Sequence, residues 1–153
     1  MLSGFLFKST YTGSDEVWRS TRFGAAAAGN LLMGKEWQLG RGRNNVLGLN
    51  FKTTYVGGFR TTPIDLGASR QKGGTILITS QTNEQRLNTY FRTDIRLSWK
   101  RNKNNFTGTL SLDIQNVTNQ ENEFSRYYDA NIGQIRLVYQ LPLIPALNYR
   151  IEF

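Results

Sequence analysis

The last nine residues, 145–153, constrain the fold of this chain more than any other stretch. Apolar and polar side chains alternate there one by one, with Leu147, Tyr149, Ile151 and Phe153 against Asn148, Arg150 and Glu152. A period of two places the two kinds on opposite faces of an extended strand. Chain ends usually fray unless a sheet holds them, so this pattern predicts a terminal strand within a sheet. An ordinary half-buried terminal strand would show the same alternation.

The same alternation recurs in longer segments upstream. Residues 88–100 show it most clearly, with Phe91, Thr93, Ile95, Leu97 and Trp99 between Arg92, Asp94, Arg96, Ser98 and Lys100. Residues 106–115 and 46–57 repeat the pattern. Two of these segments, 88–100 and 106–115, reach the roughly 9–11 residues that a tilted strand needs to cross a bilayer. A soluble sandwich could produce the same alternation with its charges facing water.

The remaining segments complete a predicted meander of strands. Residues 3–12 and 21–39 are expected to be extended, and so are the arms of a hairpin at 124–128 and 134–141. Alanines 25–28 could suggest a helix, but Gly24, Gly29 and Gly34 favour a strand. Short turns at 40–45 and 102–105 alternate with longer connections at 15–20 and 58–86 and with the extended hairpin tip at 129–133. We therefore expect an all-β, antiparallel up-and-down meander of about six long strands, with the short turns and the C-terminus on one side.

Composition excludes several functions. The chain has no cysteine and no histidine, so disulfides, thiolate ligands, zinc chemistry and the commonest general base are absent. We expect no enzyme activity, metal or cofactor. The net charge of +8 is compatible with nucleic acid or lipid head groups. Because Lys and Arg occur singly or in turns, no nucleic-acid partner is predicted.

Other candidate motifs are interpreted as ordinary structure. Two acidic pairs, Glu121 with Glu123 and Asp15 with Glu16, are expected to be solvated loop groups. Gly40 and Gly42 lack the third glycine and the following helix of a phosphate-binding loop. Asn105 and Asn116 begin glycosylation patterns, but modification is not expected.

Neither a membrane helix nor a secretion signal is evident in the sequence. No stretch reaches about 18 uninterrupted apolar residues, and the first residues do not form a signal peptide. For an exported protein, the export signal would lie upstream, and Met1 would be an internal methionine or the start of a truncated reading frame.

Five short motifs together resemble the C-terminal barrel region of TonB-dependent outer-membrane receptors. They follow the order seen in that family and span nearly the whole chain: Trp18-Arg19-Ser20-Thr21-Arg22-Phe23, Thr61-Thr62-Pro63-Ile64-Asp65, Leu112-Asp113-Ile114-Gln115-Asn116-Val117-Thr118-Asn119, Tyr139-Gln140-Leu141-Pro142 and Asn148-Tyr149-Arg150-Ile151-Glu152-Phe153. The resemblance implies a bacterial outer-membrane location and a large barrel closed around a plug, which imports a scarce nutrient. Such barrels have about 22 strands, so residues 1–153 would be the C-terminal part of the barrel, an open segment without the plug.

The resemblance also assigns expected roles to residues on the two faces. The side chains expected to face lipid are Phe91, Ile95, Leu97, Trp99, Leu110, Leu112, Ile114, Leu147, Tyr149 and Ile151. Those expected to face the lumen are Arg92, Asp94, Arg96, Asp113, Arg150 and Glu152. The expected assembly signal, read by the barrel-insertion machinery, is Tyr149, Ile151 and Phe153. Further expected partners are outer-membrane lipid, the missing plug and strands, and, through the plug, an inner-membrane energy-coupling protein.

A second hypothesis is a small complete β-barrel that acts as a pore or binds a hydrophobic ligand. The two hypotheses differ in orientation and closure, because a soluble barrel turns its apolar side chains inward whereas a membrane barrel turns them outward. Alternation alone does not distinguish inside from outside. The aromatic residues Trp99, Tyr149 and Phe153 near strand ends favour the membrane orientation, since they resemble an interfacial girdle.

Overall fold

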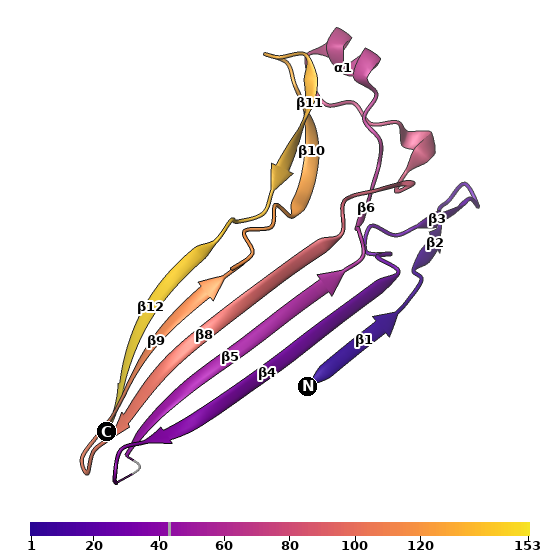
Figure 1. Cartoon of the computed structure of the whole chain (residues 1–153). Coiled ribbons are helices and arrows are strands. Elements are labelled where there is room, and N and C mark those ends of the chain that lie inside the picture. Colours follow the sequence, from indigo (N-terminus) through magenta and orange to yellow (C-terminus); the bar gives the residue numbers. More distant parts are fainter. Residues whose placement is uncertain (43) are drawn as a thin grey trace.

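A single six-stranded antiparallel sheet dominates the computed structural model, which describes residues 1–42 and 44–153 (Figure 1). Its strands, in spatial order, are β1 (Leu2–Leu6), β4 (Ala27–Leu39), β5 (Asn45–Val56), β8 (Tyr90–Asn102), β9 (Thr107–Gln115) and β12 (Ile144–Glu152). Spatial order follows chain order, so the sheet is an up-and-down meander. The sheet is open, because β1 and β12 lie at opposite edges. The predicted fold class is confirmed.

All the smaller elements lie in the connections at one end of the sheet, here called the loop end (Figure 1). They are β2 (Thr10–Thr12), β3 (Trp18–Ser20), β6 (Arg60–Thr61), α1 (Leu66–Lys72), the 3₁₀ turn η1 (Thr79–Gln81), β7 (Gln85–Arg86), β10 (Glu123–Asp129) and β11 (Gln134–Tyr139). The opposite end, here called the turn end, holds the tight connections β4–β5 and β8–β9 and the C-terminus. Long and short connections therefore alternate as the sequence predicts.

Strand register brings the alternating patterns of neighbouring strands into phase. Near the turn end, one row across five strands consists of Trp37, Leu47, Trp99, Leu110 and Tyr149. The next row consists of Lys35, Leu49, Leu97, Leu112 and Leu147. Directly paired residues point to the same face of a sheet. The sheet therefore has one mainly apolar face and one mainly polar face.

The described residues bury very little apolar surface. The buried apolar residues among them are Ala25, Leu87 and Tyr128, all at the loop end. Neither face of the large sheet is covered by a second layer (Figure 1). In the described part of the chain, no helix is long and apolar enough to cross a membrane.

Four local expectations were wrong. The extended segment expected at 3–12 breaks after Leu6, and Trp18, expected in a loop, begins strand β3. The strand expected from residue 21 begins at Ala27, because Ala26 adopts φ 67°, which is incompatible with a strand. The stretch 58–86, expected to be loop, contains α1. Asp65 caps this helix by accepting from the Ala68 amide, and Gly73 ends it in the left-handed conformation.

Candidate functional site

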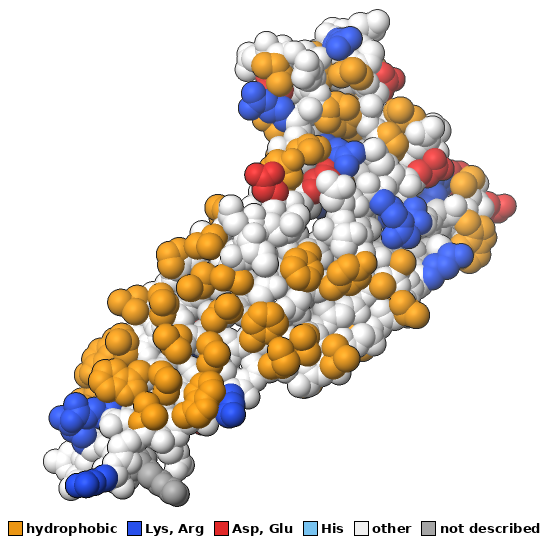
Figure 2. Space-filling view, viewed as in Figure 1, with side chains coloured by type: hydrophobic (Ala, Val, Ile, Leu, Met, Phe, Trp, Pro, Cys, Tyr) orange, Lys and Arg blue, Asp and Glu red, His pale blue; other side chains and the backbone are white. Residues whose placement is uncertain are grey.

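The apolar face is the largest candidate surface, and it is exposed. All ten residues expected to face lipid lie on it: seven are exposed, and Ile95, Leu112 and Ile114 are half-buried. Leu147 and Tyr149 keep 72% and 64% of their surface accessible. Figure 2 shows this face as a broad orange area over the sheet. Such a patch exceeds what single exposed apolar residues produce on ordinary monomers and marks an interaction surface.

A cation, Lys35, lies within the rows of this apolar face. Lys35 shares a row with four leucines, and its ammonium lies 5.5 Å from the centre of the Trp37 ring. The side chain thus extends toward the turn end, where Trp37 lies. A lysine side chain can in this way keep its methylenes on the apolar surface and its charge near the edge of the apolar face.

The polar face carries the six residues expected to face a lumen. Arg96 and Asp113 pair across β8 and β9 with Nε 3.6 Å from Oδ1. Arg96 also donates to the Ser111 hydroxyl over 3.2 Å, and Asn148 on β12 donates to Asp113 over 3.0 Å. These contacts tie three strands together on one face.

Two further ion pairs on the polar face lie within single strands. Arg92 donates to Asp94 through Nε over 2.7 Å and through Nη2 over 2.9 Å, and it also donates to Gln115 over 3.2 Å. Arg150 and Glu152 pair at 2.8 Å. Arg96 and Asp113 therefore pair between neighbouring strands, whereas the other two pairs join residues two apart on one strand.

A hollow of about 570 Å³ lies against the middle of the polar face. Its lining includes Asn50, Lys52, Arg96, Asp113 and Asn148. Cationic, anionic and amide side chains lie together there, and no second layer covers this face. This arrangement is typical of a protein surface in contact with water or other polar groups. Partly exposed ion pairs of this kind contribute at most about 1 kcal/mol each to the stability of the fold.

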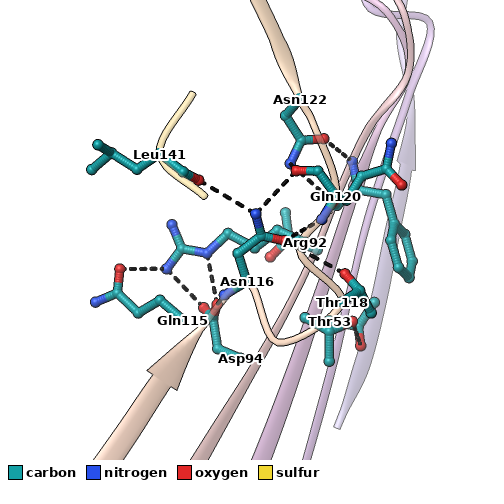
Figure 3. A network of polar contacts seen from close by, with 12 residues as sticks. Thr53, Arg92, Asp94, Gln115, Asn116, Thr118, Gln120, Asn122 and Leu141 are labelled. Carbon is teal, nitrogen blue, oxygen red and sulfur yellow. Dashed lines mark hydrogen bonds and ion pairs between the residues drawn. The ribbon is translucent and has the colours of Figure 1, made fainter. Parts of the chain in front are cut away.

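A dense cluster of polar contacts forms where the sheet meets the loop end. The strand pairing between β8 and β9 stops at Ile95 with Ile114, so the first residues of β8 need other partners on that edge. The Asn122 side chain supplies them, because its Oδ1 accepts from the Phe91 amide over 2.8 Å and its Nδ2 donates to the Phe91 carbonyl over 2.9 Å (Figure 3). One side-chain amide thus takes the place of a paired strand residue.

Asn116 closes the turn that leaves β9. Its backbone has φ 51°, and its backbone N–H donates to Asp94 over 3.0 Å. Its side-chain Nδ2 donates to the carbonyls of Gln120 and Leu141. Asn116 and Asn122 are each only 2% exposed. Figure 3 shows their side chains pointing into the junction between β8, β9 and the segment before β12. The Asn116 side chain is therefore inaccessible in the folded chain.

Glu123 corrects the expectation of a solvated loop acid. It is 4% exposed, because the Arg126 guanidinium covers it with two hydrogen bonds and the Asn88 amide donates to it over 3.2 Å. The hydrogen bonds from Arg126 are the main reason why the pKa of Glu123 lies below its ordinary value. Glu123 therefore holds the start of β10 against the end of the connection between β5 and β8.

Sequence reasoning found the two faces but not this junction. In the sequence, Asn116 belongs to a glycosylation pattern and to one of the five motifs, and neither role predicts a junction with Asn122. A detectable signal was the spacing of Asn116, Asn119 and Asn122 directly after a strand, since asparagine tolerates positive φ and bonds to nearby backbone. Asn119 has φ 49° and accepts from the Leu143 amide over 3.0 Å.

Both edges of the sheet offer unpaired backbone within the described residues. On one side β1 pairs with residues 27–31 of β4, which leaves residues 33–39 paired with β5 alone. On the other side β12 pairs only with β9. Unpaired edges of long strands are templates for further strands. Comparison of the chain with family models, curated proteins and solved structures found no match.

Proposed function

We propose that this chain is the C-terminal part of the barrel of a TonB-dependent outer-membrane receptor that actively imports a scarce nutrient. The observation that carries the proposal is the exposed apolar face opposite a charged face on an open sheet of long strands. A soluble protein would cover such a face, since burying one large apolar side chain contributes about 1.5–3 kcal/mol. Hydrocarbon chains of a bilayer can cover it without a second protein layer.

The polar face supports the same orientation. In a membrane barrel it faces the lumen, where the paired side chains of Arg96, Asp113 and Asn148 meet water or the plug. A lipid-facing position for these charges would cost about 2–4 kcal/mol per Arg or Lys near mid-membrane. The two faces are therefore not interchangeable.

The two open edges support an incomplete barrel over a small complete one. A closed barrel of six strands would pair β1 with β12, whereas these strands lie at opposite edges of the sheet. In the proposed receptor, further strands pair with both edges, the plug fills the lumen, and an inner-membrane energy-coupling protein acts through the plug. Barrel-insertion machinery would read Tyr149, Ile151 and Phe153 at the edge of β12 by strand addition.

The receptor part of this proposal is tested by the DNA upstream of the Met1 codon. We expect an in-frame coding region for an export signal, a plug and the other barrel strands. The complete product should fractionate with the outer membrane, and its deletion should abolish energy-dependent uptake of one nutrient. An in-frame stop codon directly upstream, together with a product found in the cytoplasm, would refute the proposal.

The orientation is tested by tryptophan quenching, because Trp37 and Trp99 lie on the apolar face whereas Trp18 lies in the β2–β3 hairpin. Three variants, each keeping one tryptophan and carrying Phe at the others, are refolded into vesicles of brominated phosphatidylcholine. We expect strong quenching of Trp37 and Trp99 and little quenching of Trp18. Equal quenching of all three would contradict the assigned membrane face.

A further inference from the structure

A small groove lies on the apolar face at the turn end. It has a volume of about 270 Å³ and is lined by Trp99, Arg101, Lys103, Phe106, Gly108, Leu110 and Tyr149. The row formed by Trp99, Leu110 and Tyr149 supplies apolar walls, and the next row toward the turn consists of Arg101, Gly108 and Ile151. Apolar side chains therefore line one part of the groove, and cations line the adjoining part, one row of paired residues closer to the turn.

Gly108 keeps this groove open. A methyl group built on Gly108 would lie 3.2 Å from the Tyr149 hydroxyl and 3.8 Å from two carbons of its ring. The ring therefore leans over the glycine, and its hydroxyl points toward the row that contains Arg101. Lys103 bends back at the turn so that its ammonium lies 5.0 Å from the centre of the Phe106 ring.

The turn end is strongly cationic. Its described side chains include Lys35, Arg41, Lys100, Arg101, Lys103 and Arg150, against the acidic Glu36 and Glu152. Glu152 is paired with Arg150, and the ion pairs found between described residues do not include Arg101 or Lys103. In the view of Figure 2, blue side chains mark this end and no red ones accompany them.

The loop end differs, because three of its arginines have ion-pair partners. Arg19 pairs with Asp15, Arg126 with Glu123 and Arg136 with Asp129. These three cations are therefore compensated within the protein. At the turn end, Arg101 and Lys103 are outside the ion pairs found between described residues, so both can contact a bound anion.

We propose that the groove binds the phosphate of an anionic phospholipid in the leaflet at the turn end. This inference rests on the proposed membrane orientation of the sheet. Arg101 and Lys103 would contact the phosphate, the Tyr149 hydroxyl would donate to the head group, and Trp99 and Leu110 would contact the first methylenes of the acyl chain. The groove sits on the lipid-facing side, which places it beyond the reach of lumen solutes.

The test measures lipid selectivity at Trp99. The full 153-residue chain that keeps Trp99 alone, with Trp18→Phe and Trp37→Phe, is refolded into phosphatidylcholine vesicles containing phosphatidylglycerol, with either lipid brominated. A cation near the membrane surface favours an anionic lipid by about fivefold in affinity. We therefore expect brominated phosphatidylglycerol to occupy the groove at least about fivefold more readily than brominated phosphatidylcholine, with selectivity lost at high salt.

Matched variants locate the effect. Arg101→Gln with Lys103→Gln should reduce the selectivity to nearly one while keeping quenching by brominated phosphatidylcholine. Arg70→Gln with Lys72→Gln removes the same charge from α1 at the loop end and should leave the selectivity unchanged. If the first variant keeps its lipid selectivity, or if both variants lose selectivity equally, the proposed phosphate binding in the groove is refuted. Absence of any quenching at Trp99 instead overturns the membrane orientation, so the two failures are distinguishable.

Discussion

At the scale of single residues, the loop end depends on side chains that replace backbone partners. Asn122 is the clearest case, because its amide satisfies both the N–H and the carbonyl of Phe91 where β9 has already turned away. A buried donor or acceptor left without a partner costs about 1–3 kcal/mol. The junction is therefore sensitive to changes that barely alter its volume.

Asn122→Ala should lower the free energy of unfolding by about 1–3 kcal/mol, since it leaves the Phe91 N–H and carbonyl unpaired. Urea unfolding in detergent micelles measures this change, and amide exchange at Phe91 should accelerate. Asn131→Ala at the exposed tip between β10 and β11 is the control, expected within about 0.5 kcal/mol of the unsubstituted chain. Equal stability of the two variants would refute the strand-replacement role.

Glu123 should make the loop end sensitive to acid. Arg126 holds the pKa of Glu123 below its ordinary value in the folded chain, so this stabilisation is complete at neutral pH and is lost as the pH falls through the lowered pKa. Glu123→Gln should therefore lower the free energy of unfolding at pH 7. It should also make this free energy less dependent on pH between neutral and acidic conditions. Glu121→Gln, at a neighbouring exposed acid, should preserve that dependence in urea unfolding followed across pH.

At the scale of elements, strands with strict alternation were predictable and the connections were not. Residues 88–100 were expected as a strand and form β8, because every second side chain from Phe91 to Trp99 shares one face. Helix α1 was missed, although Asp65 and Gly73 are typical helix boundaries, because its seven residues lack a long apolar period. Glu123 was misjudged since its burial depends on Arg126 and on Asn88, which lies 35 residues away.

The register of β12 can be checked directly, because the chain contains no cysteine. Arg150 lies opposite Thr109, and directly opposite residues of antiparallel strands are close enough for a disulfide. Arg150→Cys with Thr109→Cys should cross-link readily in mild oxidant. Asn148→Cys with Thr109→Cys, displaced by two residues on the same face, should cross-link much less. The reverse order, measured by thiol titration, would assign a shifted register.

At the scale of the whole molecule, the two faces have to be considered together. The alternation within each single strand fits a soluble sandwich equally well. The sheet differs from a sandwich because its apolar rows are in phase across five strands and no second layer covers them. Packing partners outside a sheet leave no trace in its alternation, so alternation predicted the two faces, whereas the exposure of the apolar face was expected from the family resemblance.

The last prediction follows from this amphipathic sheet. The full chain should aggregate in water and become monodisperse in detergent, because the exposed apolar face and both open edges require cover. Replacing Leu147, Tyr149 and Ile151 with Thr removes the apolar face of β12, which has the most exposed side chains in its rows. This variant should bind measurably less detergent and less phosphatidylcholine in vesicle flotation. Replacing Asn148 and Arg150 with Thr changes the opposite face of the same strand and should leave lipid binding intact. Equal lipid binding by the two variants would mean that the apolar face does not contact the membrane.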